Sequence, residues 1–282
     1  MTGEKCNDSS CSFECYCNFN IKIGFFFLNV EFVYSAIWQM KLGNWTLEFL
    51  LPTAYCVLST VNFFPYLCLM QNFDLSSIRN EYRMGELRAD NVLPDPVQQF
   101  AVWMDQAILS EIEEPTAMTL ATVGSEGKPS ARMVLLKGFD ERGFVFFTSY
   151  DSRKGQEISR NHQAALVIYW KELERQVRVE GMVLKTSGQE SDEYFLSRPA
   201  ESQVSAIISP QSAVIPNREH LENLRKEYMK TFTGVHKRPA HWGGFQVIPD
   251  MIEFWQGRPN RLHDRLRYAR KGGEWVIERL AP

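Results

Sequence analysis

A dense group of basic side chains lies near the carboxyl end of this 282-residue chain, in the stretch RLHDR at residues 261–265. If the stretch forms a β-strand, alternation places Arg261, His263 and Arg265 on one face. Three such groups repel one another unless an anion lies opposite them, so the spacing predicts an anion site. Trp255, shortly before them, either forms a wall for a planar ligand or fills the core.

A second basic group occurs where a strand is expected to lead into a helix. TSYDSRKG, at residues 148–155, places Arg153 and Lys154 in the first turn of a helix opened by Asp151 or Ser152. Cations are unfavourable at this end of a helix because its dipole is already positive there. A phosphate would resolve the conflict, because backbone N–H groups and both side chains would converge on it. The alternative is a solvated basic turn.

Two further groups carry potential anion ligands. Arg132 and Lys137 begin and end RMVLLK, and strand alternation directs them to opposite faces, either toward ligands or simply into solvent. Tyr194, Arg198 and Ser202 bring a phenol, a guanidinium and a hydroxyl within about two helical turns. They form either a second anion site or an exposed helix end.

Several classes of protein are disfavoured. A net charge of -3 and a pI near 6.0 provide no broad basic surface for a nucleic acid. The chain beyond residue 70 has no Ser/His/Asp order or paired carboxylates for hydrolysis, and no His/Cys/Asp cluster for a metal. It also lacks the glycine-rich phosphate loops of dinucleotide-binding and P-loop proteins.

Short strands must position most of these residues. We expect strands over 116–124, 130–139, 143–150 and 164–170, two within 175–186, and three over 243–255, 261–270 and 273–280. Helices are expected after Pro96, capped by Asp95, and around 153–161, 188–209 and 217–232. Short strands joined by tight turns favour a mainly antiparallel barrel with a few helices over a doubly wound parallel sheet.

The first seventy residues differ in composition from the rest. All six cysteines lie before residue 69, and the first arginine is Arg79. The cysteine spacings do not match those of zinc ribbons. Residues 49–70 carry no charge and are long enough to cross a membrane, but prolines interrupt them, so a membrane tether is the disfavoured alternative to a cytoplasmic protein. We expect an extension over 1–72 that is dispensable for the working protein, and a catalytic domain over 73–282.

Taken together, the motifs resemble the pyridoxine (pyridoxamine) 5′-phosphate oxidase family. The resemblance runs from about Arg79 to Pro282 and rests on RMVLLK, TSYDSRKG, LERQVRVEG, YFLSRP, SPQS, EFWQGRPNRLHDR and ERLAP. It implies a split β-barrel, mainly β with some helices, that forms a homodimer and binds FMN at the subunit interface. It also implies oxidation of pyridoxine or pyridoxamine 5′-phosphate to pyridoxal 5′-phosphate, with O2 as oxidant and H2O2 as product.

The same resemblance implies roles for particular residues. Those expected to contact FMN are Arg132, Met133, Val134, Leu135, Leu136, Lys137, Phe147, Thr148, Arg153, Lys154, Gln176, Gln211, Ser212, Trp255 and Arg265. Those expected to contact the substrate are Arg79, Tyr82, Lys137, Tyr194, Arg198, Ser202, Arg261 and His263. Of these, Arg261 and His263 are expected to flank the reacting carbon, from which a hydride passes to flavin N5. A barrel that binds flavin or pyridoxal phosphate without turnover is the alternative, but a flavin carrier needs no second phosphate site.

Overall fold

The computed structural model describes residues 32–33, 37–42, 45–50, 55–56, 76 and 81–282. The chain divides into two units, Met1–Ile78 and Arg79–Pro282. In the first unit, β2 (Ile37–Leu42) and β3 (Trp45–Leu50) pair antiparallel, as do β1 (Phe32–Val33) and β4 (Tyr55–Cys56). Arg79 and most of the uncharged stretch 49–70 lie outside the described residues, and the role of an extension over 1–72 stays a prediction. Where the structure is described, it has no helix that is both long and apolar enough to cross a membrane.

The second unit is built on a nine-stranded sheet whose pairings are all antiparallel. Its strands are β5 (Ala117–Val123), β6 (Pro129–Leu135), β7 (Gly138–Asp140), β8 (Gly143–Ser149), β9 (Gln163–Trp170), β10 (Arg175–Lys185), β11 (Trp242–Gln256), β12 (Asp264–Lys271) and β13 (Glu274–Arg279). The sheet order is β13-β12-β11-β10-β9-β5-β6, with β8 added to β11 and β7 to β8.

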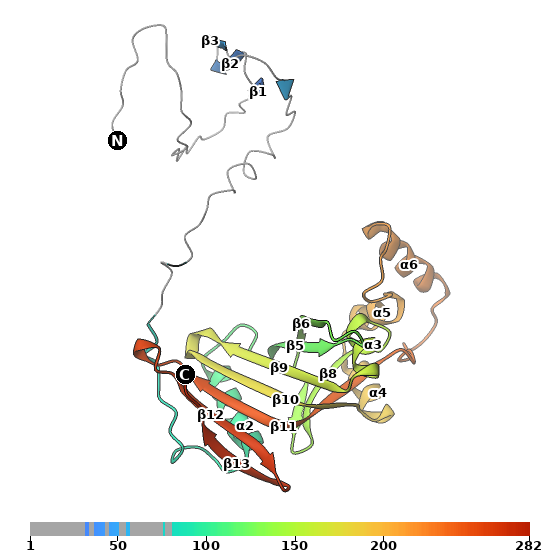
Figure 1. Ribbon diagram of the computed structural model, residues 1–282. Helices are drawn as coiled ribbons and strands as arrows, with labels where there is room; N and C mark the ends of the chain where they lie inside the picture. Colours follow the sequence, from blue (N-terminus) through green and yellow to red (C-terminus); the bar gives the residue numbers. More distant parts are fainter. Residues whose placement is uncertain (1–31, 34–36, 43–44, 51–54, 57–75, 77–80) are drawn as a thin grey trace, which may run out of the picture. The chain divides into compact units, whose positions relative to one another are not determined.

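Strand β11 organises this sheet because it is fifteen residues long and has a neighbour along both edges (Figure 1). One edge pairs with β10, and the other pairs first with β8 and then with β12. The backbone N–H of Lys137, just after β6, donates to Val145 of β8 at 2.8 Å. The path through β11, β10, β9, β5, β6 and β8 therefore closes on itself, which confirms the predicted barrel.

The core fills this barrel, because alternate residues of each strand point inward. Along β5, Met118, Leu120 and Thr122 are buried while their neighbours are partly exposed. From β8, Phe144 packs edge-on against Phe100 at 5.0 Å between ring centroids. Burying each such ring contributes roughly 1.5–3 kcal/mol to the free energy of unfolding.

The helices are α2 (Pro96–Leu109), α3 (Arg153–Arg160), α4 (Gly188–Ser197), α5 (Ala200–Ile208) and α6 (Arg218–Thr231). Asp95 caps α2 as predicted, because its Oδ1 accepts from the N–H groups of Val97 at 2.7 Å and Gln98 at 2.9 Å. Helices α3 to α6 gather at one end of β11, and β12 and β13 lie at the other (Figure 1).

The structure corrects several predicted elements. The helix expected over 188–209 is two helices, because Pro199 interrupts it. The two strands expected within 175–186 are one strand, β10, with an irregularity at Glu180/Gly181. The strand expected over 130–139 is divided into β6 and β7. The strand expected over 261–270 begins only at Asp264, since residues 259–261 form a 3-10 turn in which Asn260 and Arg261 have positive φ.

We expect Asp95→Ala to lower the free energy of unfolding by about 1 kcal/mol, because two N–H groups at the start of α2 lose their acceptor. Urea unfolding followed by circular dichroism measures the change. Asp105→Ala, an exposed position within the same helix, is the matched control and should destabilise the protein less. Equal losses in both variants would show that the cap does not stabilise the helix.

Candidate functional site

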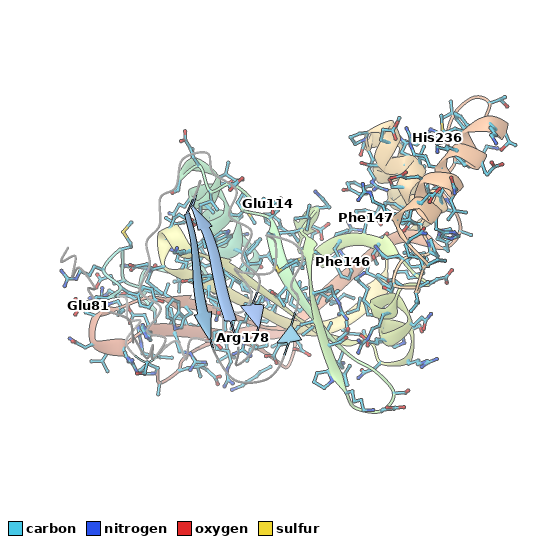
Figure 2. The ribbon with its side chains drawn as sticks, turned by 90° about the horizontal axis from the view of Figure 1, so that it is seen from above. Glu81, Glu114, Phe146, Phe147, Arg178 and His236 are labelled. Carbon is cyan, nitrogen blue, oxygen red and sulfur yellow. The ribbon has the colours of Figure 1, made fainter. Side chains whose placement is uncertain are left out.

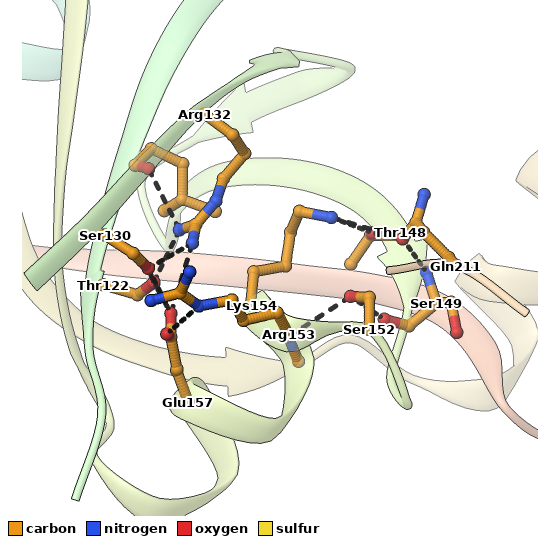
Figure 3. Close-up of polar contacts among 12 residues, drawn as sticks. Thr122, Ser130, Arg132, Thr148, Ser149, Ser152, Arg153, Lys154, Glu157 and Gln211 are labelled. Carbon is orange, nitrogen blue, oxygen red and sulfur yellow. Dashed lines mark hydrogen bonds and ion pairs between the residues drawn. The ribbon is translucent and has the colours of Figure 1, made fainter. Parts of the chain in front are cut away.

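The predicted basic helix start holds a buried lysine that has only neutral hydrogen-bond partners. Ser152 caps α3, and Lys154 in its first turn is only 9% exposed. Its Nζ lies 3.2 Å from Thr148 Oγ1 and 3.2 Å from Gln211 Oε1 (Figure 3). Burial lowers the pKa of Lys154, and the charge of Arg132 lowers it further. Among the described residues no carboxylate pairs with this lysine, so an anion bound here would meet an uncompensated charge.

A cavity of about 620 Å³ opens beside these residues. Arg153, Gln211 and Ser212 line it together with Ile207, Ile208 and His241. Gln211 thus contacts Lys154 and also lines the cavity, which links the buried cation to open space. Arg153 at the first position of α3 has a side chain that is 65% exposed, so part of its guanidinium is free for a ligand.

The two arginines of this region are held by one carboxylate. Glu157 accepts from Arg153 Nε at 2.9 Å and from Arg132 Nη2 at 3.2 Å, on different carboxylate oxygens (Figure 3). The hydroxyls of Ser130 and Thr122 also donate to Glu157. Burial opposes ionisation of Glu157, but these hydrogen bonds outweigh it and lower its pKa to about 2. Glu157 therefore stays ionised and fixes both guanidinium groups beside the cavity.

A second cation, the partly buried Arg198, lies on the other side of β8. Phe147 stacks on Tyr194 with 3.9 Å between ring centroids, and Arg198 lies over the ring of Trp242 at 4.7 Å. Nη1 of Arg198 is buried and has no hydrogen-bond partner in the described part of the chain. Burial lowers the pKa of Arg198 and raises that of Tyr194. Ser202 follows in the first turn of α5, so the structure supports the predicted grouping of phenol, guanidinium and hydroxyl.

At the far end of β11, three more predicted residues form a row across neighbouring strands. Gln176 of β10 is directly opposite Trp255 of β11, which is directly opposite Arg265 of β12. Arg265 Nε donates to Glu253 at 2.7 Å, and Arg178 donates to the other oxygen of Glu253 at 3.1 Å. Glu253 is only 3% exposed, so it fixes both arginines on this face of the sheet.

Arg261 and His263 also lie at this end of the sheet, but not on the strand that the sequence predicted. Arg261 ends the 3-10 turn at a positive φ of 61° and His263 precedes β12, so strand alternation does not align them with Arg265. His263 packs on Trp255 with ring centroids 4.7 Å apart, and Tyr82 packs on both rings. Burial lowers the pKa of His263, and the charge of Arg261 lowers it further.

The remaining predicted residues lie on or just after β6. Met133, Val134 and Leu135 belong to that strand, and Leu136 and Lys137 follow it. The side chain of Lys137 is exposed and has no hydrogen-bond partner among the described residues, so it is free to meet a ligand.

The candidate residues of one chain thus form two groups at opposite ends of β11. Thr148 is opposite Gly243 at its start, whereas Gln176 and Arg265 flank Trp255 near its end. The intervening strand spans roughly 40 Å at about 3.3 Å per residue. Figure 2 shows the same separation, with Phe147 near the helices and Glu81, the neighbour of Tyr82, at the other end of the unit. We call the residues at the start of β11 the helical group; they are Thr148, Arg153, Lys154, Gln211 and Ser212. We call those near its end the row group; they are Tyr82, Gln176, Trp255, Arg261, His263 and Arg265.

Two carboxylates were not among the predicted residues. Glu157 and Glu253 each hold a pair of arginines. Only the Arg153–Glu157 pair, four residues apart on α3, has a spacing that could have indicated it from the sequence. Arg178 and Arg265 meet Glu253 only through the pairing of neighbouring strands, and Arg132 of β6 meets Glu157 only because α3 packs beside that strand.

Comparison with known proteins gives a consistent result. Residues 104–224 match the family model described as pyridoxamine 5′-phosphate oxidase. Residues 242–282 match the model described as the pyridoxine 5′-phosphate oxidase C-terminal dimerisation region. The second match begins with β11, so it includes Trp255 and Arg265 of the row, whereas Gln176 lies within the first match.

Similar proteins carry the corresponding names. The pyridoxine/pyridoxamine 5′-phosphate oxidase of Paraburkholderia phymatum is 54% identical over 209 residues, which cover 74% of this chain and 99% of that protein. The protein of the same name from Salinibacter ruber is 53% identical over 214 residues, with the same coverage. The crystal structure of PhzG from Burkholderia lata, in complex with tetrahydrophenazine-1-carboxylic acid, superposes with a TM-score of 0.67 at 29% identity, over 72% of this chain and all of that one.

We expect Glu157→Gln to destabilise the protein at neutral pH. The pKa of Glu157 is lowered to about 2 in the folded protein, from its ordinary value of 4.5. A lowered pKa stabilises the folded state above the unfolded value, and this stabilisation is lost as the pH falls from about 4.5 to about 2. At 1.36 kcal/mol per pKa unit, the contribution at pH 7 is no more than about 3 kcal/mol.

Urea unfolding of wild type and variant at pH 7 and pH 3 tests this expectation, because the difference between them should shrink at the lower pH. Glu126→Gln is the control, since Glu126 pairs with Lys128 in an exposed salt bridge of the kind worth at most about 1 kcal/mol. A difference for Glu157→Gln that does not change with pH would contradict the assignment.

Proposed function

The chain belongs to the pyridoxine/pyridoxamine 5′-phosphate oxidase family, and from this membership we propose how its residues divide the work of such an enzyme. The protein is a flavin-dependent oxidoreductase that converts pyridoxine or pyridoxamine 5′-phosphate to pyridoxal 5′-phosphate with O2, and releases H2O2. The observation that carries the proposal is a pair of cations, the buried Lys154 and the partly buried Arg198, neither of which has a carboxylate partner among the described residues.

The helical group fits the phosphate of FMN. Lys154, the free part of Arg153 and the N-terminus of α3 supply positive charge, while Thr148, Gln211 and Ser212 add polar ligands beside the cavity. Glu157 binds Arg132 and keeps its guanidinium near this group. When bound, FMN accepts two electrons from the substrate and passes them to O2.

The second cation fits the phosphate of the substrate. Arg198 has a buried Nη1 without a partner, and Tyr194 and Ser202 lie within reach of the same helix junction. A phosphate placed here would accept hydrogen bonds from all three and offset the unfavourable burial of the guanidinium. Lys137, whose exposed side chain has no hydrogen-bond partner among the residues that the structure describes, would supply a further charge.

The row group fits the planar part of the ligands. His263 Nδ1 accepts from the backbone N–H of Arg258 at 3.2 Å. Nδ1 is therefore unprotonated, and the neutral imidazole carries its proton on Nε2, from which it can donate to a substrate oxygen. We assign Arg261 and His263 to orienting the pyridine ring and Trp255 to the wall beside it.

The separation of the two groups supports a homodimer in which each site uses both chains. Within one chain, roughly 40 Å of strand separates Thr148 from Trp255. Two residues so far apart cannot both contact the same cofactor molecule. In a twofold dimer, the helical group of one chain faces the row group of its partner, and this arrangement generates two equivalent sites. The match of residues 242–282 to a dimerisation region supports the same arrangement.

We expect Arg198→Ala to raise the KM for pyridoxine 5′-phosphate roughly 10- to 150-fold with near-normal FMN content, because one hydrogen bond to a charged group contributes about 1.5–3 kcal/mol. Arg261→Ala should also lower kcat, since its side chain acts beside the reacting carbon. Both quantities follow from the rate of anaerobic flavin bleaching, with recovery on admitting air. Its dependence on substrate concentration reports the change in KM, and its value at saturating substrate reports the change in kcat.

Arg160→Ala, an exposed position at the end of α3, is the control and should behave like wild type. If the wild-type flavin does not bleach, the protein is a carrier and the proposed turnover is wrong. If Arg198→Ala purifies without flavin, this arginine belongs to the cofactor site instead.

We expect mixed dimers to recover activity lost in two different variants. Lys154→Ala and Arg265→Ala should each be inactive alone, because every site in either dimer has one defective group. In a mixed dimer one site combines two intact groups, so random mixing should restore about a quarter of wild-type activity. A turnover assay of the randomly mixed sample measures this, and mixed dimers isolated through two different affinity tags should have about half of wild-type activity. The absence of recovery would contradict the shared site.

A further inference from the structure

A short segment lies over the row group and carries one of its aromatic rings. Residues 81–88, which we call the strap, contain no helix or strand. Tyr82 of the strap packs edge-on against Trp255 at 5.5 Å and against His263 at 5.6 Å between ring centroids. The strap therefore places a ring directly against two residues assigned to the substrate end of the site.

The carboxylate of Glu174 holds the strap immediately after Tyr82. Its Oε2 accepts from the backbone N–H of Arg83 at 2.7 Å and from that of Met84 at 2.9 Å. Neither N–H has another partner among the described residues. Because the acceptor is charged, these hydrogen bonds are stronger than those between neutral groups.

Glu174 is itself fixed to the sheet beneath the site. Its carbonyl oxygen accepts from Gly257 N–H at 2.8 Å and from Gln256 Nε2 at 3.2 Å. Its backbone adopts a positive φ of 53°, which ends the 3-10 turn Lys171–Leu173 between β9 and β10. The side chain thus extends from a rigid corner of the barrel, one residue before β10 begins.

The space between the strap and the sheet is small. A Cβ on Gly257 would lie 2.7 Å from Cβ of Tyr82, so the strap packs directly on glycine backbone. Farther along, Arg258 Nη1 donates to the carbonyl of Gly85 at 2.9 Å, and Asp264 Oδ2 accepts from Leu87 N–H at 3.1 Å. These contacts secure the later part of the strap, and Glu174 secures the backbone next to Tyr82.

We propose that Glu174 is a positioning residue that holds Tyr82 against Trp255 and His263 and so keeps the substrate end of the site covered. Glu174 itself touches neither ring and acts through the strap. The inference rests on the proposed function for the identity of the substrate, but the attachment of the strap can be measured without turnover.

The attachment is tested by amide hydrogen exchange of the flavin-loaded full chain, followed by mass spectrometry of peptides covering 81–88. Glu174→Ala should speed exchange at Arg83 and Met84 roughly tenfold, because a hydrogen bond to a charged group is lost. Glu172→Ala, at an exposed neighbour whose side chain has no hydrogen bond to any described residue, should exchange like wild type. Unchanged exchange in Glu174→Ala would overturn the proposal.

The effect on substrate is tested by steady-state kinetics with pyridoxine 5′-phosphate. Glu174→Ala should raise KM about tenfold with unchanged FMN content, and Glu174→Gln, which keeps an oxygen acceptor, should restore most of the affinity. Because Glu174 acts through Tyr82, the double variant with Tyr82→Ala should show the KM of Tyr82→Ala alone. Additive effects, or a normal KM despite faster exchange, would overturn the proposal.

Two further results distinguish failure of the Glu174 proposal from misfolding of the variant and from failure of the proposed function. If Glu174→Ala does not fold, Glu174→Gln is assayed in its place, and it should show a smaller rise in both exchange and KM. If the wild type does not turn over pyridoxine 5′-phosphate, the proposed function fails, while the exchange experiment still decides whether Glu174 holds the strap.

Discussion

The hydrogen bonding of β11 along both edges is the constraint on which the rest of the second unit depends. Its first half pairs with β8, which brings Phe147 and Thr148 to the helices, and its second half pairs with β12, which brings Arg265 beside Trp255. A single strand therefore fixes the position of both groups of candidate residues. Because a paired strand cannot shift by one residue without turning every side chain to the other face, both groups are fixed in register together.

The distribution of carboxylates separates cations that are structurally fixed from cations that are available to ligands. Glu157 and Glu253 are buried, and each joins two arginines into a rigid group. Lys154 is also buried and Arg198 is partly buried, but their described hydrogen-bond and ring partners are neutral. Burying a charge without a partner is unfavourable, so a fold that retains two such charges favours binding of two anionic groups. This electrostatic difference matches a reaction in which the cofactor and the substrate each carry a phosphate.

The sequence indicated most of the elements because their signals are local. Asp95 before Pro96 and Ser152 before Arg153 marked helix starts that the structure confirms. The prediction for residues 261–263 was wrong because alternation assumes an extended backbone, whereas Asn260 and Arg261 adopt positive φ. Glu174 was missed for a different reason, since it meets Arg83 and Met84 across ninety residues or more of chain. Contacts of that kind arise from the closure of the barrel, which no local pattern encodes.

The unpartnered guanidinium nitrogen of Arg198 and the lysine of the helical group also bear on how long the folded chain persists in a cell. Each charge has lost much of its hydration without gaining an ionic partner, so the folded state has an energetic cost that a bound phosphate removes. A ligand that binds only the folded state stabilises it in proportion to the logarithm of its free concentration. A chain with both anion sites occupied is therefore expected to unfold less often than an empty one, and to persist longer where unfolded chains are degraded.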